Sequence, residues 1–258
     1  MKKAPSFELR NLVGPATAWA SVAFLWITVA RSQSFSFHWM LLATLVAGIY
    51  GYVTRQDDLV AAMGYMPLVC LLALMALSAM TPLIPYTIDP ALLHLDRGSS
   101  ITFWHWCLAH PASYLLIRPV YVALGPAMVL GITFTRQRTR LIRALLLALI
   151  AGLACYYLFP AVGPKWVGQA GRVRNCMPSL HFAWALLLWI YANEYIRWPM
   201  FLFAVLTPIA AVGIGEHYVV DMVAAVPFTA GIIWLNSLFD IRLRAAAPNP
   251  PQPEQAGS

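Results

Sequence analysis

Two histidines and an aspartate carry the side chains best suited to catalysis in this sequence. His217 and Asp221 are four residues apart, so on a helix they would lie on one face, one turn apart. The aspartate can then accept a hydrogen bond from one imidazole nitrogen, which fixes the tautomer and leaves the other nitrogen free to attack or to bind. His181 stands at the start of an apolar segment of its own. These residue types favour nucleophilic and acid–base chemistry.

Positive charge and two predicted helix starts surround the same histidines. Ser179 suits the first turn of a helix that continues through His181. The loop just before that helix carries three cations, Lys165, Arg172 and Arg174. Helix N-termini with exposed N–H groups attract anions. Two histidines, one aspartate and three cations gathered in one place suit a phosphate ester.

The composition excludes most classes of soluble protein. The chain has 258 residues, of which 60% are hydrophobic and 10% charged, and its mean hydropathy is +0.68. An average soluble domain carries about 25% charged residues, so a soluble enzyme, a disordered chain and a disulfide scaffold all fit poorly. The four cysteines show no paired spacing, and nothing therefore requires a disulfide or a metal ion.

The chain contains about eight apolar stretches, which we interpret as membrane spans, although several are shorter than 18 residues. They fall near residues 12–30, 39–53, 59–80, 114–133, 144–159, 180–193, 199–214 and 218–237. We therefore predict an all-α fold, a polytopic integral membrane helical bundle, with loops at 81–100, 136–143 and 160–179. Residues 1–58 would supply two N-terminal transmembrane helices, 59–238 the catalytic membrane domain, and 239–258 a disordered Pro-rich tail. The first stretch is interpreted as a retained helix, with a cleaved signal peptide as the alternative.

The distribution of charge predicts the orientation of this bundle. With the N-terminus in the cytoplasm, most of the 17 Lys and Arg residues fall on cytoplasmic segments. We expect an integral protein of a bacterial cytoplasmic membrane, with both termini in the cytoplasm and the histidine site facing outward. The basic run 136–140 is then a topology signal beside anionic lipid, and not a nucleic-acid site.

Two short motifs resemble signatures of the type 2 phosphatidic acid phosphatase (PAP2) superfamily. They are Pro178-Ser179-Leu180-His181 and the pair formed by His217 and Asp221. The wording of residues 215–221 is most similar to the branch of inositol phosphorylceramide synthases and related phosphotransferases. The resemblance covers roughly residues 59–238 and implies a six-helix catalytic core, to which the first two spans are an addition.

This resemblance implies a mechanism that the residues can support. His217 would be the nucleophile and form a phosphohistidine, Asp221 would orient and charge-stabilise it, and His181 would act as general acid and then as general base. Ser179 would contact the substrate phosphate. Cations and helix N-termini would neutralise that phosphate, so no metal and no other cofactor is expected. The implied partners are a lipid phosphate substrate, of phosphatidate or polyprenyl-phosphate type, and membrane lipids, without nucleic acid.

The sequence departs from the superfamily pattern at several places. Alanines, Ala210 and Ala211, stand where the third signature usually opens with Ser-Arg, and Pro111 stands where the first signature has lysine before Arg118. The similar branch carries a Pro-rich turn before its second signature, matched here by residues 159–165, which makes Lys165 our expected phosphate contact. Arg172 and Arg174 are weaker candidates that could equally be solvated loop charges.

Several alternatives stay open at this stage. Glu216 could tune the neighbouring histidine, select a polar acceptor or simply face water. His105 and His110 lie in an aromatic stretch that suits anchoring at the membrane interface or a lid over a lipid headgroup. Hydrolysis is our first expectation, and transfer of a phospho-headgroup to a lipid alcohol is the alternative. A zinc site, a transporter and a non-catalytic membrane scaffold remain as readings of other classes.

Overall fold

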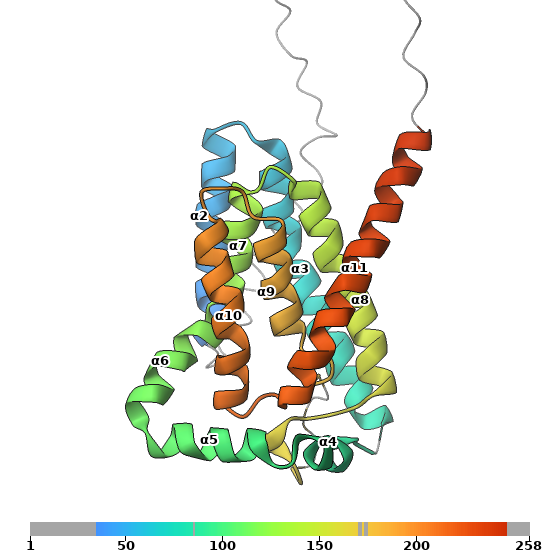
Figure 1. Ribbon diagram of the computed structural model, residues 1–258. Coiled ribbons are helices and arrows are strands. Elements are labelled where there is room, and N and C mark those ends of the chain that lie inside the picture. The colour runs from blue at the N-terminus through green and yellow to red at the C-terminus, as the bar shows by residue number, and fades with distance from the viewer. Residues whose placement is uncertain (1–34, 85, 170–171, 173–174, 247–258) are drawn as a thin grey trace, which may run out of the picture.

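Every regular element in the described part of the chain is a helix. A computed structural model describes residues 35–84, 86–169, 172 and 175–246 (Figure 1). The all-α prediction is confirmed for these residues. The elements are α2 (Phe35–Val53), α3 (Asp57–Met80), the 3-10 turn η1 (Thr81–Leu83), α4 (Asp89–Asp96), α5 (Ser99–Ala109), α6 (Pro111–Val122), α7 (Leu124–Phe134), α8 (Arg138–Leu158), the 3-10 turn η2 (Pro164–Trp166), α9 (Leu180–Ile190), α10 (Arg197–Gly213) and α11 (Val219–Ala246).

Helix α9 lies at the centre of the bundle and carries one of the candidate histidines. It packs against α7, α8, α10 and α11, and its side chains Leu187 and Leu188 are fully buried. Two glycines allow this close packing: a Cβ at Gly131 would lie 2.5 Å from the Leu188 side chain, and one at Gly152 would lie 2.8 Å from that of Leu180. The centre of the bundle therefore fixes the helix from which His181 projects.

Two short helices lie across one end of the bundle, where the sequence predicted a loop. Figure 1 shows α4 and α5 running roughly at right angles to the long helices. The prediction of a loop over 81–100 is therefore wrong. Asp89 and Pro90 begin α4, because proline suits the first helical turn, and the Asp96 carboxylate accepts from the N–H of Ser100 at 2.8 Å in the first turn of α5. We call this end, with α4, α5 and the loops 160–166 and 214–218, the site end.

Other helix boundaries also differ from the predicted ones. Helix α8 begins at Arg138, inside the predicted loop 136–143, and α11 continues to Ala246, past residue 238 where the tail was expected to begin. The predicted span 114–133 is broken into α6 and α7, which meet at a bend of 45°. Pro126 explains this break, because its ring conflicts with the carbonyl four residues earlier, at the last residue of α6.

The structure supports fewer membrane spans than the eight predicted. Among the described residues, α8 and the part of α11 from Val219 to Arg242 are long and apolar enough to cross a membrane, and the bent pair α6–α7 makes a third. Helix α9 has 11 residues, and at about 1.5 Å per residue it is too short to cross a hydrocarbon core about 30 Å thick. The first predicted span, 12–30, lies outside the described residues.

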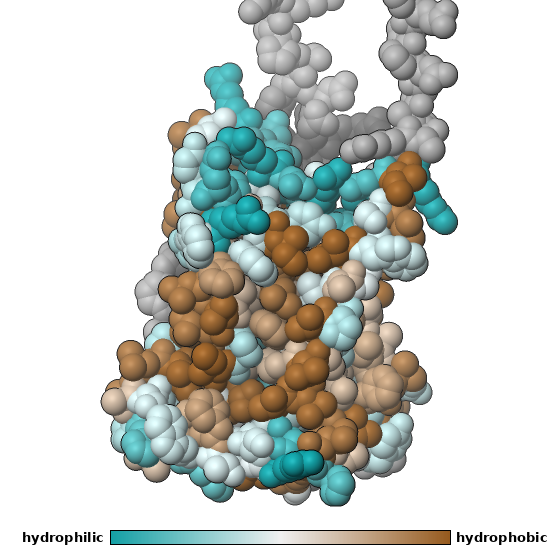
Figure 2. Space-filling view, in the orientation of Figure 1, coloured by the Kyte–Doolittle hydropathy of each residue, from teal (hydrophilic) through white to brown (hydrophobic). Residues whose placement is uncertain are grey.

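The surface of the bundle is consistent with a membrane location. On the face in view, Figure 2 shows a broad apolar belt across the middle, with the most hydrophilic residues gathered at the end opposite the site end. Large apolar side chains are exposed on several helices of the bundle, among them Leu116, Ile150, Val223 and Trp234. A soluble monomer rarely exposes so continuous an apolar surface. This belt favours contact with acyl chains.

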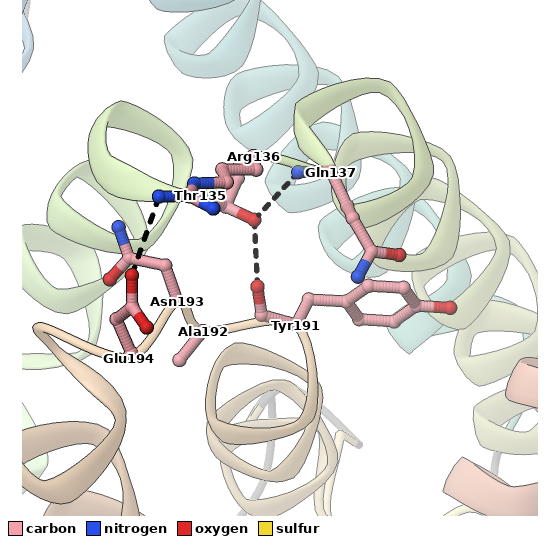
Figure 3. Close-up of a pocket in the computed structure, with 7 residues that line it drawn as sticks. All are labelled: Thr135, Arg136, Gln137, Tyr191, Ala192, Asn193 and Glu194. Atoms are coloured by element: carbon pink, nitrogen blue, oxygen red, sulfur yellow. Dashed lines mark hydrogen bonds and ion pairs between the residues drawn. The ribbon is translucent and has the colours of Figure 1, made fainter.

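The opposite end carries the basic run 136–140, whose three arginines are ion-paired there together with Arg143. Glu194 pairs with Arg136, Asp58 with Arg138, and Asp240 with both Arg140 and Arg143. A small polar pocket lies beside this run, lined by residues 135–137 and 191–194 (Figure 3). These ion pairs tie the start of α8 to the α2–α3 turn, the α9–α10 turn and α11. We call this the basic end.

Candidate active site

Three loops, residues 160–166, 175–179 and 214–218, meet at the site end and bring several of the predicted residues together. Backbone hydrogen bonds join them: the N–H of Cys176 donates to the carbonyl of Ala161 at 3.1 Å, and that of Lys165 to the carbonyl of Gly215 at 3.1 Å. Gly163, with φ +88, passes so close to the third loop that a Cβ would lie 2.2 Å from the carbonyl oxygen of Glu216. A residue without a side chain is therefore required at this crossing.

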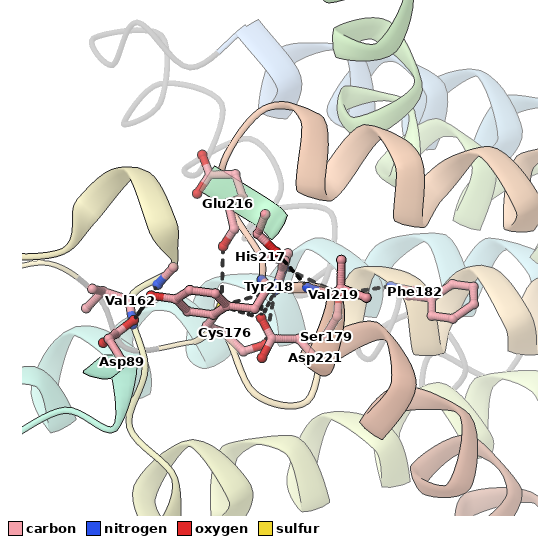
Figure 4. A network of polar contacts seen from close by, with 12 residues as sticks. Asp89, Val162, Cys176, Ser179, Phe182, Glu216, His217, Tyr218, Val219 and Asp221 are labelled. Carbon is pink, nitrogen blue, oxygen red and sulfur yellow. Dashed lines mark hydrogen bonds and ion pairs between the residues drawn. The ribbon is translucent and has the colours of Figure 1, made fainter. Parts of the chain in front are cut away.

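The imidazole of His217 is held at the centre of this cluster. Its Nδ1 lies 3.0 Å from the carbonyl oxygen of Cys176 and 3.4 Å from Oδ2 of Asp221, and its Nε2 lies 3.3 Å from Oγ of Ser179. A proton on Nδ1 can be donated to the carbonyl, with the carboxylate beside it. Nε2 then carries the lone pair, and the hydroxyl of Ser179 is placed to donate to it. Figure 4 shows these side chains converging from separate loops.

The predicted pairing of histidine and aspartate occurs, but His217 lies outside the helix. Helix α11 begins at Val219, and Asp221 lies in its first turn. From there the carboxylate reaches back and accepts from the N–H of Tyr218 at 2.7 Å, in the manner of a capping box. The turn before α11, and not one helical face, therefore brings the imidazole to the carboxylate.

The carboxylate of Asp221 is fully buried and unusually placed. Its Oδ2 also accepts from the thiol of Cys176 at 2.7 Å. Its Oδ1 has no hydrogen-bond partner among the described residues, an arrangement that costs about 1–3 kcal/mol for a buried acceptor. Burial raises the pKa of the Cys176 thiol, and the charge of Asp221 raises it further. The thiol therefore stays protonated as a donor.

His181 faces the same site from the first turn of α9. Its ring centroid lies 6.2 Å from that of His217, with an angle of 60° between the two rings. On its other face it stacks on Tyr121 of α6, at 4.1 Å between centroids and 8° between planes. The stack fixes the plane of the imidazole. The two histidine rings thus lie near one another, and the proposed role of His181 stays a prediction.

Ser179 caps α9, the helix that carries His181. Its Oγ accepts from the N–H of Phe182 at 3.4 Å, as expected of an N-cap residue, and it is fully buried. Its backbone N–H donates to the carbonyl of Asp221 at 3.3 Å. The expected cap is therefore present, and the role of Ser179 in phosphate binding stays a prediction.

Lys165 reaches the site but is already paired. Its ammonium group binds the carboxylate of Glu216, and the indole N–H of Trp166 donates to the other carboxylate oxygen at 3.0 Å. Both charged side chains are largely buried. Three roles were left open for Glu216, and of these only the one in which it simply faces water does not fit these contacts. This carboxylate neutralises the cation that we expected to contact phosphate.

The other predicted cations and histidines are further from the centre. Arg172 is exposed, stacks on the Trp166 ring at 3.8 Å and donates to Gln169 at 3.1 Å, which resembles the solvated-charge reading. Arg174 lies outside the described residues. His105 and His110 are exposed on or beside α5; the Nδ1 of His110 lies 2.7 Å from the carbonyl of Trp106. The structure brings neither of these two to His217.

One group of side chains has the composition of a metal site. Donor atoms of Cys176, His217 and Asp221 all lie within 4.8 Å of one another. Zinc bonds of about 2.0–2.3 Å place tetrahedral ligands roughly 3.5 Å apart, and two of the separations, both 3.4 Å, match this value. The third, from Sγ to Oδ2, is 2.7 Å, which is the length of a hydrogen bond. A protonated thiol accounts for this contact, and zinc would require the two atoms to separate.

Sequence reasoning missed three residues that support the site. These residues are Cys176, Asp89 and Tyr218. Asp89 is 1% exposed and accepts hydrogen bonds from Val162, Gly163 and the hydroxyl of Tyr218. The Asp-Pro pair at a helix start was the one available signal for the carboxylate. No signal in the sequence pointed to the other two.

Comparison with known proteins supports the superfamily resemblance. Residues 168–235 match the family model described as the PAP2 superfamily. The matched region holds α9, α10 and most of α11, and therefore both candidate histidines and the aspartate. A search of curated proteins and a search of solved structures each found no match. The match favours a phosphatase or phosphotransferase and is consistent with a membrane location.

Proposed function

We propose that this protein is a membrane lipid phosphatase that hydrolyses a lipid phosphate ester through a phosphohistidine intermediate. The observation that carries the proposal is the environment of His217. Its Nδ1 side is engaged by the Cys176 carbonyl and the Asp221 carboxylate, and its Nε2 side is turned toward Ser179 at 3.3 Å. An imidazole held in this way presents one nucleophilic nitrogen in one orientation.

In the first step Nε2 of His217 attacks the phosphorus. The N–P bond forms while the bond from phosphorus to the lipid oxygen breaks, and His181 donates a proton to that departing oxygen. A nucleophile approaches at about 3–3.5 Å, and a general acid acts over about 2.6–3.2 Å. With 6.2 Å between their ring centroids, the two imidazoles are close enough to act on one phosphoryl group.

In the second step water replaces the lipid alcohol. His181, now neutral, accepts a proton from the water as its oxygen attacks the phosphorus, and the N–P bond breaks to release inorganic phosphate. Asp221 stabilises the positive charge on the ring of His217 while the phosphohistidine exists. The N-termini of α9 and α11, with Lys165, would supply the positive potential that the phosphate needs.

The placement of the site suits a substrate embedded in lipid. Figure 1 shows α4 and α5 at one end of the bundle and the start of α8, beside which the paired arginines lie, at the other. With the basic end in the cytoplasm, the site lies at the outer membrane face. A lipid phosphate could then keep its tail beside the belt and present its headgroup to the histidines.

Transfer to an alcohol uses the same intermediate. If a lipid alcohol, and not water, reaches the phosphohistidine, a phospho-headgroup is transferred, as the resemblance to the inositol phosphorylceramide synthase branch implies. The half-buried carboxylate of Glu216 next to His217 would be one acceptor for the hydroxyl groups of such a substrate. Transfer is thus the second outcome that the experiment must distinguish.

The test is phosphate release by the purified protein in detergent. Phosphatidate and a polyprenyl phosphate would be supplied to the parent and to His217→Ala, His181→Ala and Asp221→Asn. Matched controls are His105→Ala and His110→Ala, because these histidines are exposed and no described contact joins their side chains to His217. We expect the first set to lose activity and the controls to retain it. Turnover by His217→Ala equal to that of the parent would refute the proposal. Labelled inositol or lipid alcohol in the same assay detects transfer.

A further inference from the structure

A buried carboxylate on α4 connects two parts of the candidate site. Oδ1 and Oδ2 of Asp89 lie 3.2 and 3.1 Å from the N–H of Val162, and Oδ1 lies 3.1 Å from that of Gly163. The hydroxyl of Tyr218 donates to the same carboxylate at 2.8 Å. Figure 4 places this group at one side of the histidine cluster. A single side chain thus holds the loops 160–166 and 214–218 together.

Tyr218 carries this connection on to the Asp–His pair. Its hydroxyl is bound to Asp89, and its own N–H donates to Oδ2 of Asp221 at 2.7 Å. The ring between these two groups is fully buried and packs with Leu92 and Ala161. Burial raises the pKa of the Tyr218 hydroxyl, and the charge of Asp89 raises it further, so the hydroxyl remains a donor.

Helix α4 is itself fixed in place, so it can serve as an anchor. The N–H of Ile88 donates to the carbonyl of Pro160 at 2.8 Å. At its other end, Asp96 accepts from Ser100 of α5, whose Oγ in turn accepts from the N–H of Val219 at 2.9 Å. The segment containing His217 is therefore held from α4 through Tyr218 and from α5 through the next residue.

The buried carboxylate of Asp89 must contribute more than packing at this position. Leaving a charge in an apolar environment is costly unless donors surround it, and Asp89 receives three donors, two from one loop and one from the other. Two apolar side chains could pack the same contact at lower cost. What apolar groups cannot supply is a fixed separation between the loop of Lys165 and the residue that follows His217.

We propose that Asp89 is a positioning residue for the reaction: through Tyr218 it sets the orientation of the His217–Asp221 pair, and through Val162 and Gly163 it sets the loop that carries Lys165. The assignment depends on the proposed phosphoryl transfer. Asp89 does not touch the reacting atoms and is not a catalytic residue. Its effect is on the rate at which the histidine attacks, because a displacement of about 1 Å can cost on the order of 100-fold in rate.

The test measures the rate of phosphohistidine formation in single turnovers. The full-length protein in detergent is mixed with phosphatidate labelled with 32P in its phosphate, quenched in alkali and analysed for protein-bound phosphate. The amplitude reports the fraction of folded molecules, and the rate constant reports positioning. The variants are Asp89→Asn, which keeps size and burial, and Tyr218→Phe, which removes one hydroxyl. The control is Thr207→Val, at a buried position of α10 where the threonine hydroxyl donates to the carbonyl of Phe203 in the same helix.

We expect both variants to lower the rate constant by about 10- to 100-fold, with KM changed less than about threefold, and Thr207→Val to retain the rate constant of the parent. Lower amplitude with an unchanged rate constant would show that Asp89 only supports folding, and it would overturn the assignment. An equal loss of rate in Thr207→Val would overturn it as well. If the parent itself forms no phosphohistidine while all variants fold, the proposed function fails, and the assignment fails with it.

Discussion

Glu216 directly precedes His217 in the chain, and its carboxylate binds the ammonium group of Lys165. This ion pair is reinforced by the indole N–H of Trp166, 3.0 Å from the second carboxylate oxygen, and by the ammonium lying 4.7 Å from the Trp166 ring centroid. The cation that we expected to meet the phosphate therefore has an anionic competitor in place. A substrate phosphate must either share Lys165 or displace the carboxylate.

The first prediction is that Glu216→Gln tightens phosphate binding. Glutamine removes the competing charge and keeps an oxygen for the indole, so Lys165 becomes available to the anion. Since such a pair contributes on the order of 1 kcal/mol, we expect inhibition by inorganic phosphate to strengthen about fivefold. Inhibition constants for phosphate check this in purified protein. Lys165→Met should weaken inhibition in the same assay, and weaker inhibition in Glu216→Gln would contradict the competition.

A second prediction concerns the proton that His181 is proposed to donate. Loss of a general acid costs about 100- to 10,000-fold when the leaving oxygen needs a proton. It costs far less when the leaving group is stable as an anion. His181→Ala should therefore be severely impaired on phosphatidate and only mildly impaired on p-nitrophenyl phosphate. His217→Ala should lose activity on both substrates, because the nucleophile is needed for each.

The comparison of the two substrates also contains the outcome that would refute this role. An equal loss on phosphatidate and p-nitrophenyl phosphate would mean that His181 binds or supports the site and transfers no proton. Tyr121→Leu offers a related check, since it removes the ring on which the imidazole stacks at 4.1 Å. It should reproduce part of the substrate-dependent loss.

A third prediction follows from the buried thiol of Cys176. Burial raises its pKa above the ordinary value of 9.0, so above pH 9 the unfolded chain releases this proton while the folded protein keeps it. The thiol's contribution to stability is thus fully present below about pH 9 and is lost as the pH rises toward the folded pKa. The loss is about 1.4 kcal/mol per pH unit for one proton.

Thermal unfolding in detergent between pH 8 and 10 tests this linkage. The parent should lose stability faster with rising pH than Cys176→Ser, because the serine hydroxyl donates to Asp221 but does not titrate in this range. Identical slopes for Cys176→Ser and the parent would remove the thiol as the cause.

The motifs of the sequence located the chemistry better than the elements that hold it. Ser179 does cap α9, and Asp221 does lie beside His217, because caps and short-range spacing are properties of local sequence. The number of spans was overestimated, since hydropathy alone does not show where a helix such as α9 ends. The break at Pro126 follows a local rule that the apolar pattern concealed.

The supporting groups were invisible for a different reason. Asp89 is 128 residues before His217 in numbering, and its partners are two backbone N–H groups and a tyrosine hydroxyl. Backbone donors leave no trace in residue types. The same holds for the carbonyl of Cys176, which lies nearer to Nδ1 of His217 than the aspartate does, at 3.0 against 3.4 Å. Such contacts depend on the tertiary path of the loops.

The last prediction separates strain from crowding at the crossing of two site loops. Gly163 and Gly168 both have positive φ, +88 and +81, but only the first lies against another chain segment. Alanine at either position incurs backbone strain on the order of 1–3 kcal/mol. At Gly163 the new methyl would also lie 2.2 Å from the carbonyl of Glu216, so the loop must move away from His217 and Asp89.

We therefore expect Gly163→Ala to lose phosphatase activity by more than about tenfold, because a displaced loop misplaces Lys165 by a distance that matters for positioning. Gly168→Ala should retain most activity, since nothing lies within 4 Å of its added Cβ. Activity per folded molecule, with the folded fraction taken from size-exclusion profiles, checks both variants. If the two variants lose activity to the same extent, backbone strain alone is responsible, and the close contact between the loops 160–166 and 214–218 does not position the site.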